Sequence, residues 1–140
     1  DLATAFANAK AIIDKHPPLL EQITLEAFMQ SGRFAAHIRR MRLIYAERQT
    51  CLITALRRDL ADVLTVEPAE TGVHLLAILR KGLDDAAFCA QAQTAGILLR
   101  PLSIYYLGPV RQQGVIFGFA AIPPRQIQTG VRRLAAALLP

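Results

Sequence analysis

The chain has 140 residues and a formal net charge of +5 at pH 7; hydrophobic residues make up 53% of it and charged residues 19%. A chain of this length buries about two-thirds of its unfolded surface in one core, so we expect one packed domain and no intrinsic disorder. Aromatic residues are only 6% and form no stripe among basic residues, which disfavours direct nucleic-acid binding by this segment despite its positive charge. No apolar run approaches the roughly 18 residues of a membrane span.

Cys51 and Cys89 lie among helix-forming residues without CxxC or CxxH spacing, which is typical of small buried side chains. Their scarcity favours a reducing, cytoplasmic location. Histidines and acidic residues do not recur at metal-ligand spacing, so we expect no metal site. The start, Asp1–Thr4, lacks the features of a signal peptide, and the missing initiating methionine favours a piece of a longer protein.

The first part of the chain is predicted to be helical. Apolar residues at three-to-four spacing predict a helix over 2–15, which the prolines at 17–18 end because proline disfavours helical geometry in the residue before it. A second helix is predicted over 19–30. Residues 32–60 keep one apolar and one basic side, which predicts a long amphipathic helix connecting two bodies. Its basic side, expected to face solvent or a partner domain, carries Arg33, Arg39, Arg40, Arg42 and Arg48.

Four short strands are predicted from apolar runs bounded by turn residues, over 63–66, 73–80, 97–99 and 115–122. His74, at the start of the second strand, is expected to be a hydrogen-bonded core residue. Gly118 is expected to mark a close approach of two backbones. Because the connection between the first two strands is short, the sheet is expected to be mostly antiparallel.

Two helices are expected to cover this sheet. Asp84 is a favourable N-cap for a helix that runs to Ala95, and Asp85 suits the first turn of that helix. Pro124 fits the first position of a last helix whose apolar residues recur on one side. Residues 101–113 are predicted to form an irregular loop. Helices at the front and a small helix-covered sheet behind them indicate an α+β fold.

Five strings of residues, taken in order, resemble those of a known family. They are HIRRMR with the following YAER, a GVHL strand start, a PLSIYY loop, an FGFA strand and the IQTGVRRL helix, at 37–48, 72–75, 101–106, 117–120 and 127–134. Together they resemble the C-terminal portion of class I/II aminotransferases. Within these, the chain most resembles the MocR-type transcriptional regulators, which join a GntR-type winged-helix DNA-binding domain to an aminotransferase-like domain.

The resemblance implies the small C-terminal domain of the fold-type I PLP-dependent transferase fold, a small mostly antiparallel sheet covered by helices and preceded by a long interdomain helix. Residues 1–31 would be helices continuing from a large PLP-binding domain, and residues 32–140 the interdomain helix plus the small domain. The parent would be a homodimer that holds pyridoxal 5′-phosphate (PLP) and an amino-acid-like effector, and it would contact DNA through its winged-helix domain. The alternative is the C-terminal domain of a genuine class I/II aminotransferase.

The chain by itself is expected to bind no PLP and to carry no catalytic residue. PLP forms a Schiff base with a lysine of its protein. Lys10, Lys15 and Lys81 lack the Ser-x-x-Lys or Ser-Lys setting of the family, so we expect them to be solvated surface residues. The resemblance places the cofactor lysine upstream of residue 1.

Five residues are candidates for facing a ligand. By resemblance, an arginine just inside the last strand binds the substrate carboxylate, but the matching place near Val115 and Ile116 has none, which disfavours ordinary transamination. An arginine suits this role because its fork donates two hydrogen bonds to a carboxylate. Arg100 and Arg111 are expected either to take the role or to be solvated charges. The loop that, by resemblance, faces the cleft carries residues that contact ligand or simply pack: Ser103, Tyr105 and Tyr106.

Overall fold

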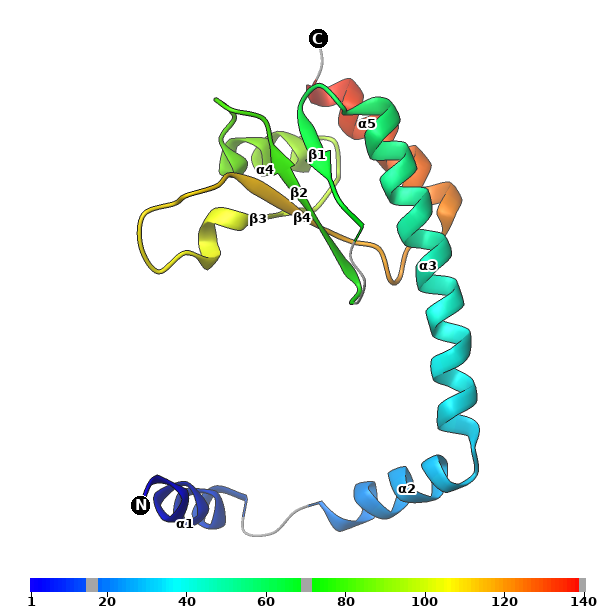
Figure 1. Cartoon of the computed structure of the whole chain (residues 1–140), viewed down its shortest axis with the longest axis vertical. Coiled ribbons are helices and arrows are strands. Elements are labelled where there is room, and N and C mark those ends of the chain that lie inside the picture. Colours follow the sequence, from blue (N-terminus) through cyan, green and yellow to red (C-terminus); the bar gives the residue numbers. More distant parts are fainter. Residues whose placement is uncertain (15–17, 69–71, 139–140) are drawn as a thin grey trace. The chain divides into compact units, whose positions relative to one another are not determined.

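The structure is a computed structural model that describes residues 1–14, 18–68 and 72–138 (Figure 1). In chain order its elements are α1 (Leu2–Asp14), α2 (Leu19–Gln30), α3 (Arg33–Asp59), β1 (Leu64–Val66), β2 (His74–Leu79), α4 (Asp85–Thr94), β3 (Arg100–Pro101), the 3-10 helix η1 (Leu102–Tyr105), β4 (Gly114–Gly118) and α5 (Pro124–Leu138). The α+β fold and the order of helices predicted from the sequence are confirmed. Lys15 and the predicted helix end at Pro17 lie outside the described residues.

The chain divides into two compact units, Asp1–Met41 and Arg42–Pro140. Every buried residue among those described lies in the second unit, from Leu52 to Leu134. The second unit therefore contains the hydrophobic core, and each unit is considered by itself below.

The first unit consists of α1, α2 and the start of α3. Its apolar side chains are largely exposed: Phe6 is 73% exposed and Ile13 is 80% exposed. Within the unit, the rings of Phe28 and Phe34 pack edge to face with their centroids 6.0 Å apart. In this unit, the helices thus keep the apolar faces predicted from the sequence without burying them.

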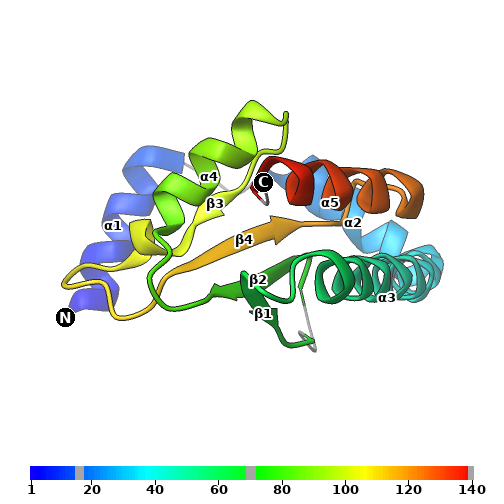
Figure 2. The same cartoon turned by 90° about the horizontal axis from the view of Figure 1, so that it is seen from above.

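The second unit is built on a four-stranded sheet in the order β1-β2-β4-β3, in which every neighbouring pair is antiparallel (Figure 2). In the central pair, Leu75 lies opposite Phe117 and Ala77 opposite Val115. Short loops join β1 to β2 and β3 to β4, whereas β2 is joined to β3, on the far side of β4, through helix α4. The mostly antiparallel sheet predicted from the sequence is confirmed.

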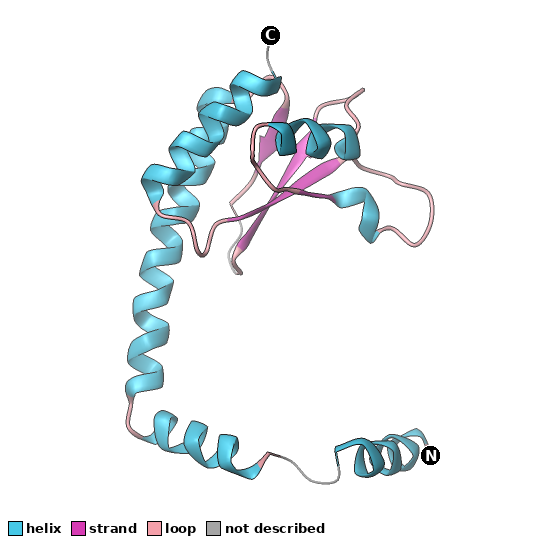
Figure 3. Cartoon of the chain, turned by 180° about the vertical axis from the view of Figure 1, so that it is seen from behind, coloured by secondary structure: helices cyan, strands magenta, loops and turns pink. Residues whose placement is uncertain are grey.

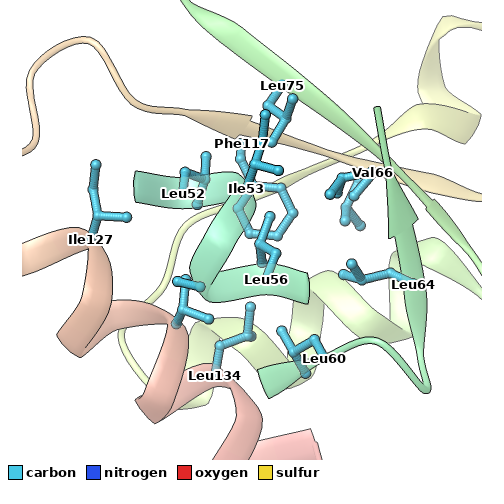
Figure 4. Close-up of a cluster of buried hydrophobic side chains, with 14 of the residues drawn as sticks. Leu52, Ile53, Leu56, Leu60, Leu64, Val66, Leu75, Phe117, Ile127 and Leu134 are labelled. Atoms are coloured by element: carbon cyan, nitrogen blue, oxygen red, sulfur yellow. The ribbon is translucent and has the colours of Figure 1, made fainter. Parts of the chain in front are cut away.

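One face of the sheet is covered by helices and forms the core. Leu75 and Phe117 on this face pack with Leu52 and Leu56 from the C-terminal half of α3 and with Leu134 of α5 (Figure 4). Leu56 and Leu75 are fully buried, and each such side chain contributes about 1.5–3 kcal/mol through burial. The opposite face carries the alternate residues of the strands, which are exposed or half-buried except for Gly114. Burial of the covered face therefore stabilises the unit. The opposite face remains accessible.

His74 lies on this second face. The burial of β2 alternates along the strand, with Leu75, Ala77 and Leu79 pointing inward, so His74 is exposed. The expectation that it is a core histidine is therefore wrong. Residues 74–79 are apolar apart from the histidine, and such a run does not reveal which alternate residues point inward.

The strand predicted over 97–99 is displaced to β3 at Arg100–Pro101. Helix α4 ends in a cap in which the N–H of Ile97 donates to the carbonyl of Ala92 and that of Gly96 donates to Gln93. Gly96 has the left-handed φ of 73° that this cap requires. The backbone of Ile97 therefore completes the end of a helix, and strand pairing begins only after it.

Two further segments differ from their predictions. The fourth strand ends at Gly118 because the chain turns there, with the N–H of Ile122 donating to the carbonyl of Phe119 at 3.2 Å. The predicted irregular loop at 101–113 contains β3's last residue and η1 (Figure 3). Pro124 begins α5 as predicted.

Most of the basic side of α3 is exposed, as expected, at Arg33, Arg39, Arg40 and Arg42. Arg48 differs, because it is half-buried and its guanidinium donates a hydrogen bond to the carbonyl of Ala120 in the turn after β4. One turn along the helix, Sγ of Cys51 lies 3.5 Å from the carbonyl oxygen of Pro124. These contacts hold α3 against the segment that leads into α5.

Candidate functional site

The residues predicted to face a ligand all lie on the segment from β3 to β4. Arg100 is in β3, Ser103 and Tyr105 are in η1, and Tyr106 follows η1 directly. Arg111 lies at the other end of the same loop, shortly before β4, and is exposed. The first four of these residues therefore lie within seven consecutive positions, at 100–106. Arg111 lies on the returning part of the same loop.

Arg100 lies directly opposite Ile116 in the ladder between β3 and β4. Cross-strand partners in an antiparallel pair have their side chains on the same face of the sheet. Val115 and Phe117 are buried on the helix-covered face, so Ile116 and Arg100 lie on the accessible face. Arg100 is exposed there. Arg100 thus lies across the ladder from Ile116, the position near which the family resemblance implies an arginine.

Asp85 is the one charged residue that is fully buried among those the structure describes. Its carboxylate accepts three hydrogen bonds: Oδ1 accepts from the hydroxyl of Ser103 at 2.6 Å, and Oδ2 accepts from the backbone N–H of Ser103 at 2.8 Å and of Gly114 at 3.3 Å. The backbone N–H of Asp85 donates to Oε1 of Gln113 at 2.9 Å. A buried carboxylate needs such partners because its desolvation is costly. One side chain therefore holds both ends of the loop between β3 and β4.

Gly114 lies where the loop rejoins the sheet, and the site leaves no room for a larger residue. A β carbon at this position would lie 2.9 Å from the carbonyl oxygen of Ala77 and 3.2 Å from Cδ2 of Leu102. At Gly118, the nearest atom to such a carbon is 3.7 Å away, which is ordinary contact. The close approach predicted at Gly118 is therefore found at Gly114 instead.

The two tyrosines of the loop differ in their surroundings. Tyr105 is 55% exposed, next to Ile104, which is 63% exposed. Tyr106 is half-buried, and its backbone N–H donates to the carbonyl of Ser103 at 3.2 Å. A tyrosine combines an apolar ring with a hydroxyl that can hydrogen-bond. The loop therefore presents Tyr105 to the outside and packs Tyr106 against the body of the unit.

A separate cavity of about 570 Å³ lies between the segment after α4, the end of β4 and α5. Its lining is mostly apolar and includes Ile97 and Phe117, together with Arg125 and Arg133. The guanidinium of Arg133 donates to the carbonyl of Ala95 at the end of α4, which gives it a structural role. The five candidate residues do not line this cavity, so it is distinct from the site that the motifs predict.

Cys89, on the helix that carries Asp85, is free and half-buried. Burial, and to a lesser extent the charge of Asp85, raises the pKa of its thiol from 9.0 to about 11. A thiol with this pKa is protonated near neutral pH and is a poor nucleophile. Cys89 is therefore a packing residue, as its sequence context predicts.

The described lysines, Lys10 and Lys81, are both exposed, whereas a Schiff-base lysine is activated in a desolvated pocket or by a neighbouring cation. Among residues 1–14, 18–68 and 72–138, His, Cys, Asp and Glu side chains form no group of three that could hold a metal ion. In the same described ranges, no helix is long and apolar enough to span a membrane.

Asp85 is not among the site residues predicted from the sequence, which assigned it only to the first turn of a helix. The structure confirms Asp84 as the N-cap, since its side chain accepts from the N–H of Ala87 at 2.8 Å. One aspartate is sufficient for this cap. An acidic residue in the first turn of a helix is favourable by itself, so nothing in the sequence indicated that Asp85 has partners in the loop.

Several known proteins are similar to the chain in sequence or in fold, although no protein-family model matches it. The chain is 38% identical over 138 residues to the probable rhizopine catabolism regulatory protein MocR of Rhizobium meliloti, a match that covers 99% of the chain and 28% of the relative. It is 26% identical over 116 residues to the uncharacterized HTH-type transcriptional regulator YdeL of Bacillus subtilis (strain 168), with 83% of the chain and 25% of the relative covered.

Among solved structures, the α-aminoadipate aminotransferase LysN from Thermus thermophilus, complexed with N-(5′-phosphopyridoxyl)-L-leucine, matches with a TM-score of 0.82 and 24% identity. The match covers 94% of the chain and 33% of the aminotransferase. The fold is that of the small C-terminal domain of the fold-type I PLP-dependent transferases. Within this class, the chain matches the C-terminal part of a MocR-type regulator, which confirms the resemblance of its motifs. It spans about a quarter to a third of the lengths of these relatives.

Proposed function

We propose that the chain is the C-terminal portion of the effector-binding, aminotransferase-like domain of a transcriptional regulator, in which it closes over an amino-acid-like ligand bound to PLP. The observation that carries this proposal is the 38% identity to a regulator over 99% of the chain, combined with a fold shared with aminotransferases. The parent protein would be a cytoplasmic homodimer whose other parts supply a large PLP-binding domain and a winged-helix DNA-binding domain.

The described residues do not fit PLP itself, because neither Lys10 nor Lys81 has a setting that could hold it. In the parent, PLP would supply the aldehyde that captures an amino group. The contribution that we assign to this chain is recognition of the ligand's carboxylate and exclusion of water from the closed site.

Arg100 is the residue that we assign to the carboxylate. It is exposed, and it lies across the ladder from Ile116, beside the position where the family resemblance implies an arginine. A guanidinium can give a carboxylate two parallel hydrogen bonds, and its charge is permanent. Arg111 is the second candidate because it lies on the same loop. Tyr105 and Tyr106 would provide ring surface and hydroxyl groups beside the ligand.

A test of these assignments uses the full-length protein that contains this chain, with N-(5′-phosphopyridoxyl)-L-leucine as the probe. Arg100→Met is expected to weaken binding about 10- to 100-fold, the effect of losing hydrogen bonds to a charged group. Arg132→Met serves as the control, since Arg132 is exposed on α5 away from the loop. Unchanged affinity in both Arg100→Met and Arg111→Met would remove the carboxylate assignment.

A genuine aminotransferase is the second candidate function, and the structural match to LysN favours it. The coding sequence upstream of Asp1 distinguishes the two. A winged-helix segment followed by a PLP-lysine motif is the result expected for the regulator. A PLP-lysine motif without a DNA-binding segment would support the aminotransferase and contradict the regulator.

A further inference from the structure

We propose that Asp85 is the positioning residue of the ligand-facing loop, which it holds in a binding-competent conformation by fixing the loop at Ser103 and Gly114. The inference rests on the proposed function, since it assigns a role to the loop that carries the candidate ligand contacts. Asp85 itself is fully buried and lies at the start of α4, so it acts through the loop without contacting the ligand.

Both ends of the loop meet at Asp85. The loop leaves the sheet after β3 at Pro101 and returns at Gly114, and these two ends lie on neighbouring strands. The Asp85 carboxylate accepts from the hydroxyl and backbone N–H of Ser103 at the first end and from the N–H of Gly114 at the second. Gln113, next to the second end, accepts from the N–H of Asp85. Both ends of the loop are therefore attached to the first residue of one helix.

Apart from the half-buried Tyr106, the middle of the loop has little support of its own. Between the two ends, Ile104, Tyr105 and Val110 are largely exposed, and Arg111 is also exposed. These residues have few buried contacts to fix the loop. Segments with few buried contacts open locally at a small fraction of the cost of global unfolding. The conformation of the loop thus depends on its two anchored ends.

The conformation of the loop sets the affinity for ligand. When only a fraction of the molecules has a binding-competent loop, the apparent dissociation constant rises in inverse proportion to that fraction. Loss of the charge-assisted hydrogen bonds at the buried Asp85 is expected to lower the ratio of ordered to open loop by about 10- to 100-fold. Ser103 acts in the same way, because its hydroxyl donates to the carboxylate of Asp85.

The variants are chosen to separate this role from general stabilisation. Asp85→Ala removes both acceptor oxygens and so all three hydrogen bonds. Asp85→Asn is the conservative replacement, since its amide oxygen can accept the two backbone N–H groups while its NH2 group donates to the Ser103 hydroxyl. Asp84→Ala is the matched control: it removes an aspartate from the same helix start and loses the N-cap bond to Ala87, but it leaves the loop anchors intact.

The experiment measures two quantities in the full-length protein: hydrogen–deuterium exchange of residues 102–114, and the affinity for N-(5′-phosphopyridoxyl)-L-leucine. Asp85→Ala is expected to accelerate loop exchange and to weaken binding, each by about 10-fold or more. Asp85→Asn is expected to keep most of the protection of the loop from exchange and most of the affinity for the conjugate. Asp84→Ala is expected to leave loop exchange and affinity within about 2-fold of the wild type, although it weakens the helix start.

If Asp85→Ala does not fold, Ser103→Ala gives the same test with one hydrogen bond removed, and Ser103→Thr, which keeps the hydroxyl, is expected to bind more tightly than Ser103→Ala. Unchanged loop exchange in these variants would overturn the anchoring role. Faster exchange with unchanged affinity would overturn the positioning role and leave the proposed function intact. A wild-type protein that does not bind the conjugate would overturn the proposed function and the link to ligand, while the exchange data still decide whether Asp85 fixes the loop.

Discussion

The carbonyl oxygen of Ala77 lies 2.9 Å from the point that a β carbon at residue 114 would occupy. Residue 114 is glycine, buried, at the first position of β4. Gly114→Ala forces the added methyl group against the backbone of Ala77 on the neighbouring strand, so we expect it to destabilise the chain by about 1–3 kcal/mol. The measurement is urea unfolding of the 140-residue chain. Gly108→Ala is the control, because nothing lies within 4 Å of its added carbon; equal midpoints for the two variants would contradict the close packing.

A second prediction concerns the core contributed by α3. Leu56 is fully buried against the sheet, whereas Leu43, on the same helix, is 75% exposed. Leu56→Ala is expected to cost about 2–5 kcal/mol of unfolding free energy, because it leaves a cavity as well as losing burial. Leu43→Ala should change it by less than about 0.5 kcal/mol. Denaturant unfolding followed by circular dichroism gives both values, and similar losses in the two variants would argue against the described core.

A third prediction follows from the raised pKa of Cys89. The pKa of its thiol is about 11 in the folded chain, above its ordinary value of 9.0. Alkylation of Cys89 by iodoacetamide at about pH 8 should therefore be much slower in the native chain than in the unfolded chain, and should accelerate as the pH approaches the folded-state pKa. A Cys51→Ser background isolates the signal. Rapid native alkylation at the lower pH would show that the thiol is not protected.

The raised pKa of Cys89 also makes the unfolding free energy depend on pH. The folded state holds the Cys89 proton more tightly than the unfolded state because the thiol pKa is raised, so the contribution is present in full below pH 9.0 and is lost as the pH rises toward about 11. Unfolding free energy measured across this interval should fall more steeply for the wild type than for Cys89→Ala. Parallel curves would contradict the shift.

A fourth prediction concerns the exposed apolar faces of α1 and α2. Contiguous exposed apolar surface promotes association, and Leu2, Phe6, Ile12 and Ile13 of α1 are all at least 73% exposed. The 140-residue chain should self-associate with increasing concentration in sedimentation velocity. Residues 42–140, which contain the whole described core, should stay monomeric and unfold cooperatively. A sharply monomeric full chain at high concentration would refute the expectation.

Much of the architecture follows from periodicity. The α2 helix occupies Leu19–Gln30 as predicted, because apolar spacing and the flanking proline and glycine act locally. The prediction of a strand at 97–99 is wrong, since an apolar triplet does not reveal that Ile97 completes a helix cap. Local patterns also cannot assign a face to His74, which depends on the register with β4. Errors thus occur where a long-range or capping hydrogen bond decides the outcome.

The candidate site was only partly predictable. The PLSIYY string identified the loop that carries Ser103, and the structure places Arg100 in β3 and Ser103 in η1. The partner of Ser103 is Asp85, 18 residues earlier in the sequence. No spacing rule connects residues on a helix start and a 3-10 turn, so their pairing becomes visible only when the sheet brings both to one place.

Because the loop between β3 and β4 begins and ends on a single buried carboxylate, its two attachment points lie outside its exposed middle. The residues at 104–112 make none of the hydrogen bonds to Asp85, which involve only Ser103, Gln113 and Gly114. If the loop carries the proposed ligand contacts, replacing this one surface segment would change the ligand preference without a change in the hydrophobic core.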